Sequence, residues 1–213
     1  MYYFKFTSIN NVYLNESRST GTTNPYFGQY AASNGMVNKE HDRSWSYNYQ
    51  QRINWHQVYG KHDVEVMLGH EYYRAYGYAL YAGKHNQFSV DNKELAGAVV
   101  LDNGSSSMSE YNTESWLSRV MYNYDSRYFG SVSAMRQASS RFSKDNWWGT
   151  FWSFGAGWNM HKESWFNVDW INELKLKASY GENGNDGIGS YMYTKYFSIV
   201  NSNNEVSLTP SSL

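Results

Sequence analysis

The stretch Thr150–His161, with the sequence TFWSFGAGWNMH, decides the fold because its alternate residues differ in polarity. Five of its six even-numbered positions are apolar, against one of its six odd-numbered positions. The even positions are Thr150, Trp152, Phe154, Ala156, Trp158 and Met160, and the odd positions are Phe151, Ser153, Gly155, Gly157, Asn159 and His161. A period of two residues predicts a β-strand with two unlike faces, whereas a helix would mix Trp152 with Gly155 and Asn159 on one stripe.

The same alternation recurs along the chain and predicts several more strands. The clear examples are 45–59, 63–71, 116–124, 128–134 and 173–180. Weaker patterns predict strands near 2–13 and 190–200. The strands expected at 41–59 and 63–83 exceed the usual length of about 5–6 residues in soluble sheets. The predicted fold class is therefore all-β, with long antiparallel strands.

The predicted connections differ in length. Gly60–Asp63 and Tyr124–Arg127 are expected to be tight hairpin turns, whereas 14–40 and 84–112 are long polar stretches rich in Asn, Ser, Gly and Thr. The other predicted connections are 138–148, 181–189 and 161–171, the last as a short turn of helix or a loop at the membrane boundary. Short turns at one end and long loops at the other are typical of outer-membrane β-barrels, where Trp and Tyr favour the headgroup boundary. A soluble β-sandwich also alternates, because one face is buried against a second sheet, so this pattern leaves both folds open.

The composition narrows the function classes. The 213 residues are 41% hydrophobic and 19% aromatic, with a mean hydropathy of −0.72. No apolar run approaches the roughly 18 residues that a membrane-spanning helix needs. A net charge of −1 without a Lys/Arg cluster argues against a nucleic-acid partner. The lack of cysteine excludes disulfides, thiol nucleophiles and cysteine metal ligands.

The sequence contains no motif for catalysis or metal binding. It has no Gly-x-Ser-x-Gly nucleophile motif, and its carboxylates are scattered. Its six histidines lack a metal-ligand spacing such as His-Glu-x-x-His. We therefore expect no enzyme activity, no catalytic residue, no metal site and no cofactor.

The candidates for ligand binding lie in one predicted connection and are Arg141, Asp145, Trp147 and Trp148. Aromatic faces stack on sugar rings and charged groups bond to hydroxyls, so this loop would suit a glycan. The alternative is that Trp147 and Trp148 only anchor the end of a strand at the membrane surface, and this interpretation is preferred.

The glycine-rich segment 181–189, GENGNDGIG, permits two interpretations. Asn183, Asn185 and Asp186 carry oxygen atoms of the kind that bind calcium. A tight glycine-rich connection between strands is the simpler interpretation, because the segment also lacks the order of a phosphate-binding loop.

Charged residues fall on one face of the strand predicted at 173–180. Lys175 and Lys177 alternate with apolar neighbours, and Glu173 shares their parity. In a barrel this face would line a polar, water-filled interior, where the lysines would touch a plug or a passing substrate.

Four motifs follow one another in an order and spacing typical of one protein family. They are YNYDSRY (122–128), SSRFSKDNWWGTF (139–151), SFGAGW (153–158) and LKLKASYGENGN (174–185), preceded by GKHD (60–63) and LGHE (68–71). This series resembles the barrel of SusC/RagA-type TonB-linked outer-membrane transporters, over roughly residues 40–195.

The resemblance implies a barrel of about 22 strands closed around a plug domain. It implies import of a glycan, peptide or other nutrient across the outer membrane of a Gram-negative bacterium. The implied partners are the TonB complex, a SusD-type surface lipoprotein and the outer-membrane lipid.

Residues 1–213 are accordingly expected to be a partial TonB-dependent receptor barrel of about eight strands, with short periplasmic turns and long extracellular loops. The plug domain, a signal peptide and the final strands are not recognised in the sequence. Two alternatives stay open: a self-contained small outer-membrane barrel acting as an anchor or adhesin, and a secreted carbohydrate-binding β-sandwich.

Overall fold

A computed structural model describes residues 2–28, 31–168, 170–195, 197–202 and 205–210 of the chain. The described residues form strands and short 3-10 helices and no α-helix, which confirms the predicted all-β class. No helix among them is long and apolar enough to cross a membrane. The strands are β1 (Tyr2–Thr23), β2 (Met36–Tyr59), β3 (His62–Gln87), β4 (Ala98–Tyr124), β5 (Tyr128–Ser139), β6 (Trp148–Asn159), β7 (Lys175–Gly181), β8 (Phe197–Ser202) and β9 (Glu205–Pro210). The 3-10 helices are η1 (Ala31–Ser33), η2 (Leu95–Gly97), η3 (Lys144–Asn146) and η4 (Met160–Lys162).

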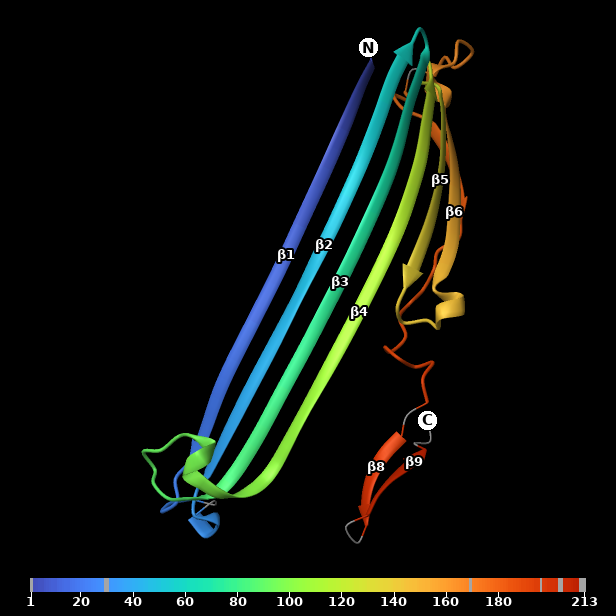
Figure 1. Ribbon diagram of the computed structural model, residues 1–213. Coiled ribbons are helices and arrows are strands. Elements are labelled where there is room, and N and C mark those ends of the chain that lie inside the picture. Colours follow the sequence, from blue (N-terminus) through green and yellow to red (C-terminus); the bar gives the residue numbers. More distant parts are fainter. Residues whose placement is uncertain (1, 29–30, 169, 196, 203–204, 211–213) are drawn as a thin grey trace. The chain divides into compact units, whose positions relative to one another are not determined.

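Seven strands form one antiparallel sheet in the order β1 to β7, so each strand lies beside its neighbour in sequence (Figure 1). β8 and β9 form a separate two-stranded sheet. Both predicted hairpin turns are confirmed, at 60–61 and at 125–127. Asp125 and Ser126 have φ angles of 52° and 55°, which gives the turn the backbone twist that antiparallel strands require.

The predicted long loops at 14–40 and 84–112 are largely wrong. β1 continues to Thr23 and β4 begins at Ala98, so the connections are only 24–35 and 88–97. Residues 8–22 and 99–109 are exposed on both sides of their strands. Their polar and apolar residues do not alternate, so the pattern that marks a strand is lost there.

Two smaller predictions are corrected at the C-terminal side of the sheet. The strand expected at 173–180 is β7, which begins at Lys175 and leaves Glu173 in the preceding connection. The strand expected at 190–200 begins only at Phe197, because 190–193 form a turn. Of the segment 161–171, predicted as a short turn of helix or a loop, only 161–162 lie in a helix, the 3-10 helix η4, and 163–168 form a bend, a turn and irregular backbone.

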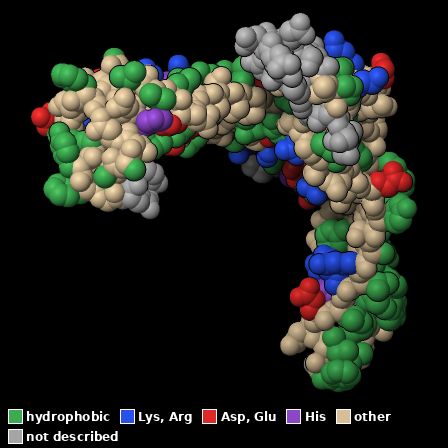
Figure 2. All heavy atoms as spheres, turned by 90° about the horizontal axis from the view of Figure 1, so that it is seen from below, with side chains coloured by type: hydrophobic (Ala, Val, Ile, Leu, Met, Phe, Trp, Pro, Cys, Tyr) green, Lys and Arg blue, Asp and Glu red, His purple; other side chains and the backbone are tan. Residues whose placement is uncertain are grey.

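The strand register separates an apolar face from a polar face. Val120, Val132, Phe154 and Tyr180 form one row across β4 to β7, whereas Arg119, Ser133, Ser153 and Gly181 form the adjacent row. The apolar side chains stay exposed, with Phe154 at 47% and Tyr180 at 58%. Figure 2 shows hydrophobic side chains standing at the surface. A sandwich would bury this face against a second sheet, so the exposure favours a barrel wall.

The chain divides into two compact units, Met1–Ile9 with Tyr49–Tyr72 and Asn112–Leu213, and Asn10–Asn48 with Tyr73–Tyr111. The first unit contains β5 to β9 and the turns at 60–61 and 125–127. The second contains the connections 24–35 and 88–97, and among the described residues it holds the buried apolar side chains, Val37 and Ala98.

Aromatic rings stack along the second unit. Trp45 lies 5.6 Å from Tyr76 and 6.0 Å from Tyr47, centroid to centroid, and the Arg74 guanidinium lies 5.5 Å from the Trp45 ring. Such rows of Trp and Tyr are typical of the girdles of membrane barrels.

Candidate functional site

The polar face of the first unit holds a cavity of about 520 Å³. Its residues come from β2 to β7 and include small side chains at the floor and charged side chains at both sides. They are His56, Asp63, Glu65, Met121, Tyr122, Asn123, Phe129, Gly130, Ser131, Gly155, Ala156, Gly157, Lys175, Lys177, Ala178 and Ser179. The predicted placement of Lys175 and Lys177 on the polar face is confirmed, since Lys177 is paired with Gly157 of β6.

Opposite charges stand at the two sides of this cavity. On the β2–β3 side, Nε2 of His56 lies 2.6 Å from Oδ1 of Asp63. On the β7 side, Nζ of Lys175 lies 4.1 Å from the centroid of the Phe129 ring, which attracts the ammonium through its π face. A molecule in this cavity would therefore meet carboxylates on one side and ammonium groups on the other.

Glycine keeps the floor of the cavity open. A Cβ atom added to Gly155 would lie 3.0 Å from Oγ of Ser131, closer than side chains normally approach. The cross-strand pair Ser133 and Ser153 continues the small-residue surface with a hydroxyl–hydroxyl hydrogen bond of 2.6 Å. Close approach to Ser131 on the neighbouring strand thus explains the glycine at position 155.

Two connections at the opposite end of β5 and β6 from the 125–127 turn form a second candidate site, here called the loop pair (140–147 and 182–189). Arg141 Nη1 donates a 2.8 Å hydrogen bond to the backbone oxygen of Asp186. Oγ of Ser139 donates a 3.0 Å hydrogen bond to Oδ2 of the same residue. Asp186 thereby joins the predicted candidate Arg141 to the glycine-rich segment.

The other three predicted binding residues lie apart from this contact. Asp145 lies in η3, and Trp147 donates its indole N–H to the Phe142 oxygen at 2.7 Å. Trp148 begins β6 on the apolar face, with the Arg136 guanidinium 5.2 Å from its ring. That position suits the anchoring interpretation of Trp148, and glycan binding by the four residues stays a prediction.

Two of the three residues proposed for calcium, Asn185 and Asp186, already accept hydrogen bonds. Oδ1 of Asn185 accepts a 2.8 Å hydrogen bond from the backbone N–H of Gly187, and Asp186 accepts from Ser139. No group of three or more His, Cys, Asp or Glu suited to a metal occurs in the part of the chain that the structure describes. These contacts argue against a calcium site. The prediction of a tight connection between strands is also wrong, because the strand after β7 begins only at Phe197 and belongs to the separate sheet.

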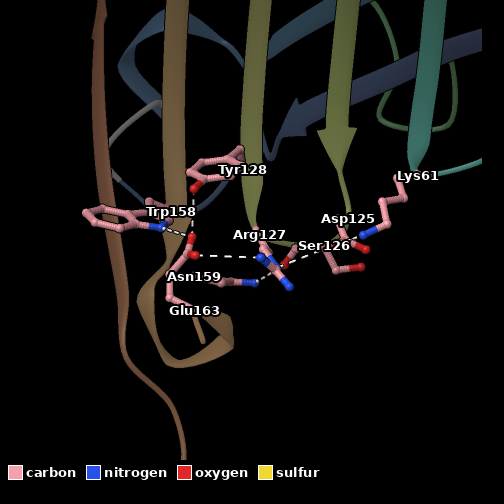
Figure 3. Close-up of polar contacts among 8 residues, drawn as sticks. All are labelled: Lys61, Asp125, Ser126, Arg127, Tyr128, Trp158, Asn159 and Glu163. Carbon is pink, nitrogen blue, oxygen red and sulfur yellow. Dashed lines mark hydrogen bonds and ion pairs between the residues drawn. The ribbon is translucent and has the colours of Figure 1, made fainter. Parts of the chain in front are cut away.

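A polar cluster joins the turns at the other end of the strands, here called the turn cluster (Lys61, Asp125, Ser126, Arg127, Tyr128, Trp158, Asn159 and Glu163; Figure 3). Oε1 of Glu163 accepts hydrogen bonds from Oη of Tyr128 at 2.7 Å and from the indole N–H of Trp158 at 2.9 Å. Arg127 lies 3.6 Å from Glu163 and 3.4 Å from Asp125. Lys61, in the neighbouring turn, lies 3.0 Å from Asp125. The cluster thus links the β2–β3 turn, the β4–β5 turn and the connection after β6.

These contacts favour the ionised carboxylates. The indole N–H of Trp158, followed by the Tyr128 hydroxyl, lowers the pKa of Glu163 below its ordinary value. The Lys61 ammonium lowers the pKa of Asp125 in the same way. Both groups are therefore negative at neutral pH and hold their cationic and hydrogen-bonding partners in place.

Sequence reasoning missed the turn cluster and the role of Asp186, because both join loops whose contacts follow no periodicity. Arg136 was also missed, although a signal was present. Its even number puts it on the same face as Val132 and Ala134, which makes it a charged residue in an apolar row.

A wide antiparallel sheet with one exposed apolar face, one polar face and hairpin turns at one end has the features of the wall of an outer-membrane β-barrel. No protein-family model matches the chain. The chain is 32% identical over 151 residues to the TonB-dependent receptor P3 of Formosa agariphila, which covers 70% of this chain and 15% of that protein. It is 38% identical over 76 residues to the TonB-dependent receptor SusC of Bacteroides thetaiotaomicron, covering 35% of this chain and 8% of SusC.

The fold agrees with these relatives. A chain of the RagAB peptide transporter superposes with a TM-score of 0.90 at 23% identity, over 99% of this chain and 24% of that chain. By its sequence relatives, the chain belongs to the SusC/RagA-type TonB-dependent receptors, as the sequence motifs predicted. It spans about one-sixth of the length of the curated receptors P3 and P39, at 15% and 16%. These relatives carry the names of receptors and transporters and not of enzymes.

Proposed function

We propose that this chain forms part of the barrel wall of a TonB-dependent importer in the outer membrane of a Gram-negative bacterium. The observation that carries the proposal is the sequence match to TonB-dependent receptors over 70% of the chain. In this proposal the apolar face contacts lipid and the polar face lines the lumen. The chain itself has no catalytic role.

The imported nutrient is a glycan or a peptide in this proposal. The cavity on the polar face offers carboxylates and ammonium groups on opposite sides, which suits a zwitterionic or polyhydroxylated solute. The loop pair, at the extracellular end in this orientation, adds Arg141, Asp145 and Trp147 for first contact with the substrate.

We expect the parent protein to act with a SusD-type surface lipoprotein and with the TonB complex. The connections 24–35 and 88–97 carry exposed aromatic side chains of the kind that partner proteins bury: Tyr26 is 69%, Phe27 77% and Phe88 93% exposed. Replacement of Phe88 by Ser should reduce co-purification of the lipoprotein, whereas Val99→Ser, at an exposed position of β4, should not.

Deletion of the gene that encodes this chain tests the import function. The deletion strain should fail to grow on one class of polymer, glycan or peptide, as the sole nutrient, and should grow normally on the corresponding monomers. Complementation with the full-length gene should restore growth only in a strain with a functional TonB complex. Unchanged growth on all polymers, with a heat-modifiable band near 24.8 kDa in the outer-membrane fraction, would instead support a self-contained small barrel.

A further inference from the structure

The apolar face of the first unit carries a groove of about 500 Å³, which lies outside the proposed import path on the polar face. Its walls include Phe6, Ile53, Leu68 and Trp116, which are 64%, 48%, 55% and 54% exposed. Four large apolar side chains from four different strands therefore line this groove.

Arg136 of β5 lies at this groove and is its charged boundary. It is paired with Trp116 on β4 and with Thr150 on β6, so its side chain shares the apolar face. Its guanidinium stacks on Trp148 at 5.2 Å from the ring centroid. β5 ends at Ser139, so Arg136 lies near the end of the strand that leads into the loop pair.

Arg136 has no anionic partner within the described ranges of the chain. The carboxylate of Glu114 on the same face is engaged elsewhere: it accepts a 3.2 Å hydrogen bond from the Trp116 indole and lies 3.3 Å from Nε2 of His70. An arginine on a lipid-facing surface costs free energy, least near the membrane boundary. A lipid phosphate at that boundary would offset this cost.

We propose that Arg136 and the adjoining groove bind a phosphorylated, acylated lipid of the outer leaflet, with the phosphate on the guanidinium and an acyl chain against Ile53 and Leu68. The guanidinium fork matches phosphate in a bidentate manner, and Trp148 holds it at the groove. The inference rests on the proposed outer-membrane location. Because the end of β5 that carries the loops faces the cell exterior in that orientation, the lipid is the lipid A of lipopolysaccharide and not an inner-leaflet phospholipid.

Binding of purified diphosphorylated lipid A to the detergent-solubilised full-length protein tests this site, with native mass spectrometry as the readout. Arg136→Ala should weaken lipid A binding about tenfold, since a charge-assisted contact is lost. Arg119→Ala is the matched control, because Arg119 is paired with Ser133 on the polar face of the same strand pair, and it should leave binding unchanged. Leu68→Trp should fill the groove and also weaken binding.

Three results would overturn the proposed site. The Arg136→Ala protein could bind lipid A as tightly as the unmodified protein does. The unmodified protein could bind dephosphorylated lipid A, or phosphatidylglycerol, as tightly as it binds diphosphorylated lipid A. The last two use the unmodified protein and do not depend on the folding of a variant. Membrane fractionation tests the proposed location separately. A protein that binds lipid A through Arg136 but is absent from the outer membrane would refute the location and leave the site intact.

Discussion

The Tyr128 hydroxyl donates a 2.7 Å hydrogen bond to the Glu163 carboxylate, which lies 35 residues further along the chain. Tyr128 begins β5 and Glu163 follows η4, so this bond fastens the connection after β6 to the hairpin turn before β5. Trp158 donates to the same oxygen. The Glu163 carboxylate thus joins residues at the start of β5 and the end of β6.

Removal of that carboxylate should loosen this end of the barrel. Glu163→Ala leaves the Tyr128 hydroxyl, the Trp158 indole and the Arg127 guanidinium without their acceptor. The unfolding temperature, measured by the change in gel mobility on heating, should therefore fall by a few degrees. Glu163→Gln retains an oxygen acceptor, so its unfolding temperature should fall less. An Ala variant as stable as the parent protein would show that the turn cluster does not contribute to stability.

The turn cluster should also make stability depend on pH in the acidic range. The pKa values of Glu163 and Asp125 are lowered in the folded protein, so the folded state binds fewer protons than the unfolded state. Their stabilising contribution is complete above the ordinary carboxyl range and is lost as the pH falls through the lowered values. Unfolding temperatures measured from pH 7 to pH 3 should therefore decline more steeply for the parent protein than for a Glu163→Gln, Asp125→Asn variant.

Arg141 should control the order of the glycine-rich connection. Arg141→Ala removes the donor to the Asp186 backbone oxygen, and amide hydrogen exchange in 182–189 should accelerate about tenfold. Asp186→Asn keeps that backbone oxygen and a side-chain acceptor for Ser139, so its exchange should change little. Equal exchange in the two variants would contradict the assigned contacts.

Substitution of Gly35, in the second unit, should destabilise the protein. Its φ angle is +74°, and an added Cβ would approach the Gln87 side chain and lie 3.0 Å from the backbone oxygen of Thr23. Gly35→Ala should cost about 1–3 kcal/mol of stability. Gly28 is the matched control, since its φ angle is +87° but nothing lies within 4 Å of an added Cβ. Gly28→Ala should therefore cost only about 1 kcal/mol, and urea unfolding of both variants measures the difference.

Uptake measurements on variants can distinguish the substrate-binding residues of the loop pair from a residue that only anchors the strand. If glycans or peptides contact this loop, Asp145→Ala and Trp147→Ala should each reduce the rate of uptake severalfold. Trp148→Phe keeps an aromatic ring on the apolar face and should leave uptake unchanged. Unaltered uptake in the first two variants would remove the loop from the binding surface.

Periodicity predicts the part of the fold in which the two faces have different surroundings. β6 alternates cleanly because Phe154 stands on the apolar face and Ser153 on the polar face. Residues 8–22 of β1 and 99–109 of β4 show no such alternation, so the same backbone geometry leaves no trace in the sequence. The hairpin turns were predictable because Gly60 and the Tyr-Asp-Ser-Arg segment suit tight turns.

The candidate sites were harder to predict than the strands. Parity alone placed Lys175 and Lys177 on the polar face. The contact of Arg141 with Asp186 joins two loops 45 residues apart, and no pattern along the chain encodes that distance. The outward position of Arg136 was encoded by parity, but its pairing with Trp148 depends on side-chain geometry that the sequence does not state.

The separation of the two faces also sorts the tryptophans by their surroundings. Trp116, Trp148 and Trp152 stand on the apolar face and are 54%, 41% and 42% exposed, whereas Trp147 turns its indole into its own loop. In a membrane of brominated lipids, the fluorescence of the first three should be quenched according to their depth, while that of Trp147 should persist. In variants that retain one tryptophan at a time, the extent of quenching would measure the depth of that strand position in the bilayer.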